Sequence, residues 1–126
     1  MQDITVDLPA IITAHIAAHN RPDPESFIAT FSEGALLNDA QREFVGHAAI
    51  RAWADKEIFG DHVTMDVQSA YRNGKNIVVH ARIEGDFDKT NLPDPVILTY
   101  YFSIEADLIV QLIILLNKSN WAPAHD

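Results

Sequence analysis

The sequence contains no cysteine, so it can form neither a disulfide framework nor a thiolate nucleophile or metal site. This absence is compatible with a reducing cytoplasm, where we expect the protein to be located. Basic residues are scarce, with 9 Lys and Arg against 18 Asp and Glu and a net charge of -9. A chain this acidic repels phosphate backbones, which argues against nucleic acid as a partner.

Export signals and long apolar runs are missing as well. The first ten residues carry acids where a signal peptide needs positive charge, so we expect no export signal. The longest apolar run, 108–116, is interrupted by Gln111 and is too short to span a bilayer, so we expect no membrane partner. At 126 residues and 48% hydrophobic content, the chain is expected to form one domain over 1–126. We expect its core at about 5–117 and a C-terminal tail at 118–126.

The N-terminal segment has the spacing of an amphipathic helix. Apolar residues recur every three or four positions from Leu8 to about Asn20, which predicts a helix there. Asp7 is the expected N-cap, because its side chain could accept from a free backbone N–H. His15 and His19 lie on the apolar stripe and are therefore expected to point toward the interior or its rim.

Two further helices flank a short strand that ends in an acid. Asp23 followed by proline predicts the start of a second helix. An apolar strand at 35–37 then leads to Asp39, and a second short strand lies at Phe44 and Val45. A third helix is expected from Gly46 to about residue 60, where a glycine stands at a usual stop position.

From His62 onward the pattern changes to the two-residue period of strands. Val63, Met65, Val67 and Ser69 are expected on one face of the first strand, and Asn73-Gly74 is a hairpin turn signal. Strands are then expected at 77–87, 96–104 and 108–117. The last is apolar on both faces, which predicts that both faces are covered.

Helices first and strands last predict an α+β fold, with helices on one face of a curved antiparallel sheet and a pocket between the layers. The opposite, convex face also needs a cover. We expect a homodimer formed through this face of the sheet, which would cover residues such as Ile97, Thr99, Tyr101 and Ile109.

This layout resembles the NTF2-like superfamily, the cystatin-like α+β cone shared by SnoaL-like polyketide cyclases, ketosteroid isomerases and scytalone dehydratase. The segments that carry the resemblance are HIAAHNRPDPESFIATFSEGALLND, VGHAAIRAW and YYFSIEADLIVQLIIL. Together with their order and spacing, they cover nearly the whole chain. The resemblance implies a curved antiparallel sheet whose three N-terminal helices enclose a pocket, with no cofactor.

The resemblance also implies site residues. Asp39 falls where ketosteroid isomerases keep their general-base aspartate, although Ala40 follows it here instead of a proline. His15 falls at the position of the oxyanion-binding tyrosine, and Tyr100 at that of the protonated aspartic acid. Both replacements can still donate a hydrogen bond, so a base facing two donors remains a sensible catalytic set.

The pocket wall is expected to bind a small apolar or aromatic ligand, because aromatic side chains suit a flat apolar molecule. His19, one helical turn after His15, is expected at the rim or in a structural role. The full expected wall is Trp53, Phe31, Leu37, Phe27, Phe102 and His19.

Structural interpretations compete with these catalytic ones. Asp39 could instead cap a turn or pair with Arg42 or Arg51, and His15 could be a hydrogen-bonded core histidine. His15 and His19 are four residues apart and could bind a metal ion with Asp39, but the pair lacks the glutamate of a zinc-helix motif. We therefore expect no metal.

The sequence thus predicts a SnoaL-like pocket protein without a cofactor. The catalytic hypothesis is an isomerase, cyclase or dehydratase that abstracts a proton from a small apolar carbonyl compound, with Asp39 as base and His15 and Tyr100 stabilising the enolate. The alternative is a non-catalytic module for small-ligand binding or dimerisation, including one with only a vestigial pocket.

Overall fold

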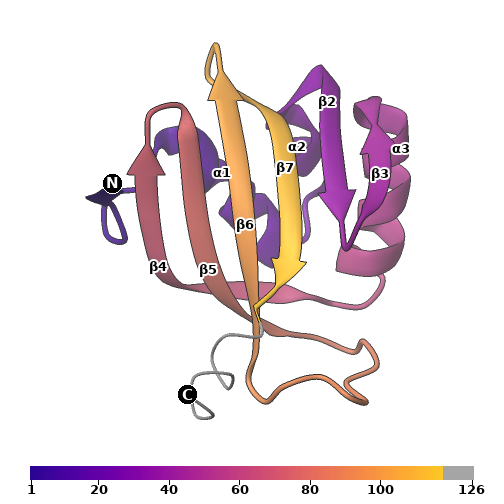
Figure 1. Cartoon of the computed structure of the whole chain (residues 1–126). Coiled ribbons are helices and arrows are strands. Elements are labelled where there is room, and N and C mark those ends of the chain that lie inside the picture. Colours follow the sequence, from indigo (N-terminus) through magenta and orange to yellow (C-terminus); the bar gives the residue numbers. More distant parts are fainter. Residues whose placement is uncertain (118–126) are drawn as a thin grey trace.

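The computed structural model describes residues 1–117 of the chain, in which a curved sheet carries helices on one face (Figure 1). This arrangement confirms the predicted α+β class. The expected tail at 118–126 lies outside the described residues. The elements are β1 (Gln2–Asp3), α1 (Ala10–Asn20), α2 (Pro24–Ala29), β2 (Phe31–Asp39), β3 (Arg42–Val45), α3 (Gly46–Ala54), the π-helix η1 (Asp55–Phe59), β4 (Thr64–Asn73), β5 (Asn76–Glu84), β6 (Val96–Glu105) and β7 (Leu108–Leu116).

The seven strands lie in the order β1-β4-β5-β6-β7-β2-β3. All neighbouring strands are antiparallel except β2 and β7, which pair in parallel. Neither this parallel pair nor the two-residue β1 was predicted from the sequence. Pairing between β2 and β7 joins the N-terminal half of the chain to the hairpins of the C-terminal half, so the edge pair β2–β3 extends the sheet next to α3 (Figure 1).

The starts of the first two helices differ in how they are capped. The predicted cap Asp7 is wrong, because α1 begins only at Ala10, and Pro9 occupies the cap position without a side-chain hydrogen bond. The backbone N–H of Asp7 instead closes a turn onto the carbonyl of Ile4. The predicted cap of α2 is confirmed, since the carboxylate of Asp23 accepts from the backbone N–H of Ser26 at 3.2 Å.

The third helix changes its winding near its end. It begins at Gly46 as expected, but Asp55–Phe59 form the π-helix η1. A π-helical turn holds one more residue than an α-turn and is common at functional sites. Gly60 ends it where a side chain would not fit, because an added Cβ would lie 2.6 Å from the carbonyl oxygen of Lys56. The wider turn presents Glu57 and Ile58 toward the inner face of the sheet.

An irregularity in β4 changes which of its residues face the core. The pairing with β5 shifts between Val67 and Ser69, so the alternation is interrupted there. Val63 and Met65 are buried as predicted, but beyond the shift Ala70 is buried and Ser69 is not. The prediction for Ser69 is therefore wrong, because an extra residue in one strand inverts the phase of every residue that follows it.

The turn between β2 and β3 explains why alanine follows the strand-end acid. Ala40 and Gln41 both have positive φ, at 52° and 71°. Two residues of positive φ form the tight turn that matches the twist of a hairpin. Proline is fixed near a φ of −65° and is excluded from this conformation. The replacement of the expected proline by Ala40 is thus a requirement of the turn.

The two faces of the sheet differ in how deeply their side chains are buried. The inner face of β5 and β6 is apolar and packed as predicted, with Ile77, Val79 and Phe102 fully buried. On the outer face Tyr101 and Leu115 are 42% and 41% exposed. Ile109 was expected on that outer face, but it is fully buried beside Phe31. The pairing of β6 with β7 shifts between Ser103 and Ile104, which changes the alternation near this residue.

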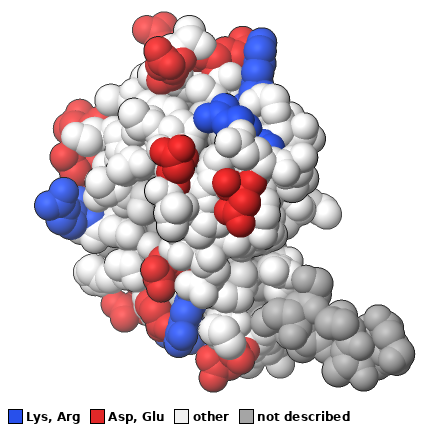
Figure 2. All heavy atoms as spheres, turned by 90° about the vertical axis from the view of Figure 1, so that its left-hand side faces the viewer, with Lys and Arg blue, Asp and Glu red and all other residues white. Residues whose placement is uncertain are grey.

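The charged residues lie on the surface. Figure 2 views the side that carries β1 and β4, where acidic side chains are scattered over an otherwise uncharged surface and basic ones are few. Within residues 1–117, no helix is long and apolar enough to cross a membrane.

Candidate functional site

A cavity of about 350 Å³ opens at the end of the sheet where β2 and β7 finish and β6 begins. Its walls come from the inner face of the sheet, from α3 and η1, and from the connection between β5 and β6. We call that connection the mouth loop (85–95). The lining residues are Asp39, Ala40, Trp53, Glu57, Ile58, Asp61, Val63, Ile83, Phe87, Leu92, Val96, Leu98, Tyr100, Ile114 and Leu116.

Asp39 and Tyr100 reach this cavity because three strands align them in one row. Asp39 pairs with Ile114 across β2 and β7, and Ile114 pairs with Tyr100 across β7 and β6. Residues paired directly across strands project from the same face of the sheet. With strands about 4.8 Å apart, the backbones of the outer two lie roughly 10 Å from each other. A small ligand could therefore contact both side chains at once.

The two oxygens of the Asp39 carboxylate have different surroundings. Oδ2 accepts from the indole Nε1–H of Trp53 at 3.1 Å and from the guanidinium of Arg42 at 2.7 Å. Within residues 1–117, Oδ1 has no hydrogen-bond partner. The side chain is 22% exposed, so it is partly shielded but not sealed. The donors on Oδ2 fix the orientation of the carboxylate and leave Oδ1 available to a molecule in the cavity.

Arg42 joins Asp39 to the π-helix. Its guanidinium donates two hydrogen bonds to the Glu57 carboxylate, at 2.7 and 2.9 Å, while also holding Asp39. Hydrogen bonding to Glu57, followed by the nearby acids, raises the pKa of Arg42, and the same bonds lower the pKa of Glu57. Both groups therefore stay charged at neutral pH. The expected alternative pairing of Asp39 with Arg42 is present, and it coexists with the place of Asp39 in the cavity wall.

Tyr100 is buried at 3% exposure yet lines the cavity. Burial raises its pKa above the ordinary value, and the negative charge of Asp39 raises it further. The phenol thus remains protonated at neutral pH and keeps its O–H as a donor. Among the described residues its hydroxyl has no hydrogen-bond partner. A buried hydroxyl is normally hydrogen-bonded, so this donor is available to a ligand or water in the cavity.

The structure does not bring His15 to the cavity. Its ring is 1% exposed and is enclosed by Phe27, Phe31 and Phe102, with ring centroids 4.7, 5.5 and 5.4 Å away. Its Nδ1 lies 3.2 Å from the hydroxyl of Thr30, which donates to the Phe27 carbonyl and therefore accepts from His15. Phe102 stacks beside Tyr100 and stands between the two candidate donors in the packing.

His19 is likewise a core residue, 2% exposed. Its Nδ1 lies 3.2 Å from the amide oxygen of Asn20, which also accepts from the backbone N–H of Met65. An amide oxygen cannot donate, so Nδ1 of His19 carries the proton. The other nitrogen, Nε2, is buried without a partner.

Of the six residues expected to bind the ligand, Trp53 lines the cavity. The other five, Phe31, Leu37, Phe27, Phe102 and His19, are buried in the core outside its wall. These side chains fill the space between α1, α2 and the sheet with a cluster of rings, for example Phe27 against Phe31 at 5.6 Å. The cavity therefore occupies only the open end of the space between the layers.

Several wall residues were not predicted. Phe87 and Leu92 lie on the mouth loop, where they are the only large apolar residues in a polar stretch. That isolation was a usable signal, because an apolar residue kept in a polar loop often packs on something. Glu57 had no such signal, since its direction depends on the π-helical turn.

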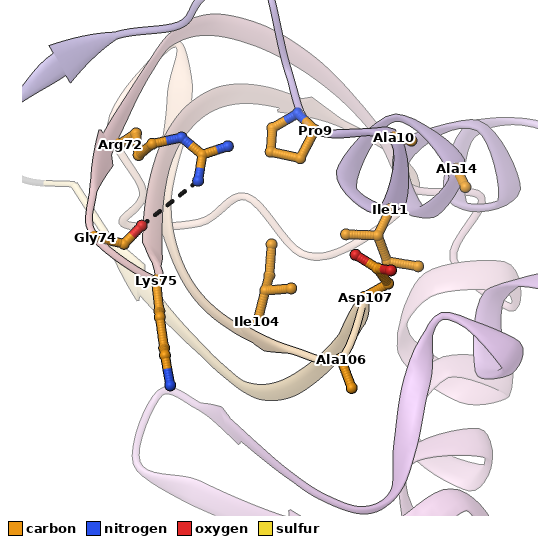
Figure 3. A pocket seen from close by; sticks show the side chains of 10 residues that line it. All are labelled: Pro9, Ala10, Ile11, Ala14, Arg72, Gly74, Lys75, Ile104, Ala106 and Asp107. Atoms are coloured by element: carbon orange, nitrogen blue, oxygen red, sulfur yellow. Dashed lines mark hydrogen bonds between the residues drawn. The ribbon is translucent and has the colours of Figure 1, made fainter.

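A second cavity, of about 750 Å³, lies at the opposite end of the sheet (Figure 3). It is bounded by the start of α1 and by the β4–β5 and β6–β7 turns, and it is lined by Pro9, Ala10, Ile11, Ala14, Arg72, Gly74, Lys75, Ile104, Ala106 and Asp107. None of the predicted site residues lies there. In the described part of the chain, no group of three His, Asp or Glu side chains is placed to hold a metal ion.

The buried histidines predict that acid destabilises the fold. Burial lowers the pKa of His15 to about 3, with repulsion from His19 as the second cause, and burial lowers the pKa of His19 to about 4. Unfolding restores the ordinary value of 6.5, so the unfolded chain binds more protons. Stability should be full above about pH 6.5 and fall by up to about 1.4 kcal/mol per pH unit per histidine as pH drops toward the folded values.

Urea unfolding followed by circular dichroism, between the folded pKa values of the two histidines and pH 6.5, measures this loss of stability. His19→Gln should reduce the slope, because it removes one of the two buried groups that take up a proton on unfolding. Equal stability at both ends of the range would contradict the prediction.

Comparison with protein families gives one clear match. The model of the SnoaL-like domain matches residues 12–112, which is most of the chain. Among curated proteins, none matches this sequence.

Several solved structures share the fold. A protein of Sinorhizobium meliloti, named as a candidate polyketide cyclase, is 26% identical with a TM-score of 0.79, over 88% of this chain and 98% of that one. A protein of Catenulispora acidiphila with a ketosteroid-isomerase-like fold, in complex with trimethylamine, is 20% identical with a TM-score of 0.74, over 88% of both chains. TerC co-crystallised with polyporic acid is 10% identical with a TM-score of 0.70, over 90% and 93%.

The last two are too distant in sequence to indicate more than a common fold. The family match extends from α1 into β7 and therefore includes the strands that carry Asp39 and Tyr100. The chain belongs to the SnoaL-like domain family and has the NTF2-like fold.

Proposed function

We propose that the protein abstracts a proton from the carbon next to a carbonyl group, with Asp39 as the base and Tyr100 as the electrophile. The observation that carries the proposal is that Asp39 and Tyr100 line the same cavity, and that neither Asp39 Oδ1 nor the Tyr100 hydroxyl has a hydrogen-bond partner among the described residues. A free acceptor and a free donor in one pocket suit a substrate that loses a proton at one atom and gains negative charge at another.

The proposed step is balanced within the site. Oδ1 of Asp39 takes the proton from carbon, the electrons of the C–H bond form the C=C bond of an enolate, and the carbonyl oxygen becomes negative. The Tyr100 O–H donates a hydrogen bond to that oxygen. Trp53 and Arg42 hold Oδ2, so the carboxylate stays oriented during the step.

The sequence predicted two hydrogen-bond donors to the enolate oxygen, and the proposed mechanism uses one of them. His15 was expected to share the oxyanion with Tyr100, but its ring lies outside the cavity wall. In the proposed mechanism Tyr100 is therefore the donor contributed by the protein, and His15 supports it through Phe102, which stacks on Tyr100 with centroids 6.1 Å apart.

The cavity limits the substrate to a small and largely apolar carbonyl compound. About 350 Å³ is at the lower end of the range for small-molecule pockets. Most of the wall is aliphatic or aromatic, so the body of the substrate would be held by burial. Return of the proton to another carbon would make the reaction an isomerisation, whereas loss of a leaving group or attack on a second carbonyl would make it an elimination or a cyclisation.

A non-catalytic function is the second candidate. The ion pair of Asp39 with Arg42 favours it, because the guanidinium already occupies one oxygen of the carboxylate in a structural contact. In that case the same cavity would bind its ligand without turnover. Relatives with this fold have been crystallised with small molecules, including trimethylamine and polyporic acid, which supports ligand binding under either proposal.

Replacement of the base separates the two candidates. Asp39→Asn keeps the shape of the side chain but removes its basicity, so exchange of the α-protons of small ketones with D₂O should fall by about 100-fold or more. Proton NMR of a ketone panel measures this exchange. Asp66→Asn, at an exposed acid on β4, is the matched control and should keep the wild-type rate. An exchange rate that is unchanged in Asp39→Asn would exclude Asp39 as the base. Ligand binding by the wild-type protein without exchange above the protein-free rate would favour the non-catalytic function.

Removal of the donor tests the electrophile. Tyr100→Phe keeps the ring packed against Phe102 and deletes only the hydroxyl, so kcat should fall by about 10²–10³-fold with little change in KM. Tyr101→Phe is the control, because the next residue of β6 faces the outer surface. Equal kcat values for the two variants would exclude Tyr100 as the oxyanion donor.

We also propose that the outer face of the sheet forms a homodimer. Tyr101 and Leu115 are exposed apolar residues on adjacent strands of this face. Half-buried apolar side chains such as Val78, Ile97 and Ile113 lie around them. A second copy would remove this surface from water on both chains at once, as a two-fold interface requires.

Sedimentation velocity tests the dimer. We expect the wild-type protein to sediment as a dimer at micromolar concentration, and Leu115→Glu to shift it to the monomer, since a buried unpaired charge is costly. Val6→Glu places the same charge on an isolated apolar residue that is 99% exposed and should have no effect. A monomeric wild-type protein would rule out this interface.

A further inference from the structure

The charged residues of the cavity wall are all acids. Asp39, Glu57 and Asp61 line the cavity, and we call them the wall acids. Among the residues that the structure describes, no lysine, arginine or histidine lines it. Charges of one sign around a cavity with low-dielectric walls focus the field inside it. The wall acids therefore set the charge that a ligand can carry.

The three wall acids are not equally neutralised. Arg42 lies outside the wall and binds both Asp39 and Glu57, so those two acids share one positive charge. Asp61 differs from them, because in residues 1–117 its carboxylate has neither an ion pair nor a hydrogen bond. Its backbone carbonyl accepts from Asp86, which fixes the position of the residue in the wall without using the side chain.

The residues around the entrance of the cavity do not offset the negative charge of the wall acids. The mouth loop contains Asp86, Asp88 and Asp94, all exposed, and its one basic residue is Lys89. The ammonium of Lys89 donates to the carbonyl of Gly85 at 2.7 Å. It also lies over the ring of Phe87, 5.1 Å from the centroid. Asp86 lies 2.8 Å from Nδ1 of His62, at an exposed pair. The entrance is thus acidic overall, with its one lysine already engaged.

The wall also offers aromatic rings to a cation. Trp53 and Tyr100 line the cavity from α3 and β6, and Phe87 lines it from the mouth loop, with one of its faces already covered by Lys89. The faces of such rings attract an ammonium group, and the attraction is stronger where water is excluded. The same rings and the aliphatic wall would bury an apolar body. An anionic group would find neither a basic side chain nor an unused cationic partner in the described wall.

We infer that the cavity is specific for a carbonyl compound that carries an ammonium group, and that Asp61 binds this group. The inference rests on the proposed function, because Asp39 and Tyr100 would act on the carbonyl while Asp61 holds the charged end. The apolar body between the two ends would lie along the aliphatic wall, including Ile83 and Leu98. Asp61 is in this view a specificity-determining residue, and it takes no part in the proton transfer.

Three acetophenones that differ only in their para substituent test the inference: a methyl group, an aminomethyl group and a carboxylate. Isothermal titration calorimetry at neutral pH and low salt measures the affinities. We expect the aminomethyl compound to bind about three- to tenfold more tightly than the methyl compound, the range for a partly exposed ion pair with some cation–π contribution. The carboxylate should bind more weakly than both.

The assignment to Asp61 is tested by a matched pair of variants. Asp61→Asn should reduce the preference for the aminomethyl compound to about twofold or less, since the ion pair is lost and the rings remain. Asp66→Asn changes the net charge equally but lies outside the cavity, so it should keep the wild-type preference. Added salt should weaken the preference in the wild-type protein and have little effect in Asp61→Asn.

The possible results separate this inference from the proposed function. Equal affinities of the three compounds, tighter binding of the carboxylate, or an unchanged preference in Asp61→Asn would overturn the inference. Deuterium exchange at the acetyl methyl, measured on the neutral compound and lost in Asp39→Asn, would in those cases leave the proposed function in place. An ammonium preference that depends on Asp61, without exchange of any of the three compounds, would support the ligand class and refute the proton transfer.

Discussion

The parallel pairing of β2 with β7 is the contact on which the candidate site depends. It places the end of β2 beside the end of β7, so that Asp39, Ile114 and Tyr100 form one row across three strands. It fixes β2 and β3 against the hairpins of the second half, while β1 and the side chain of Asn20 attach the start of the chain to β4. Parallel pairing needs a long connection between its strands, and here most of the chain forms that connection.

The site combines rigid packing with unused polar groups. Trp53 and Arg42 hold one oxygen of Asp39, and Phe102 packs beside the ring of Tyr100. The remaining oxygen and the phenol hydroxyl have no partner in the described part of the chain. Buried or partly buried polar groups without partners reduce stability, and such groups tend to be kept where they contact a ligand.

The sequence predicted part of the site. A strand-end acid and the inward period of β6 placed Asp39 and Tyr100 near a pocket, and both line the cavity. The apolar stripe of α1 also placed His15 inward, which is where it lies, but a stripe gives only a direction. Whether an inward side chain reaches a cavity or the core depends on its neighbours. For His15 the neighbours are three phenylalanine rings that enclose it.

Local signals in the sequence determined the elements of the protein. The cap at Asp23 and the alternation along β5 and β6 each act over a few residues, and the structure follows them. The hairpin signal at Asn73-Gly74 is also followed, with the turn one residue later, at Gly74 and Lys75. Tertiary structure decided the parallel pairing, the shift in β4, the π-helical turn that presents Glu57, and the depth of the cavity. These features depend on contacts between residues far apart in the chain, whose energies no local pattern contains. The sequence by itself therefore defined the strands and helices, and their packing determined which residues share the cavity.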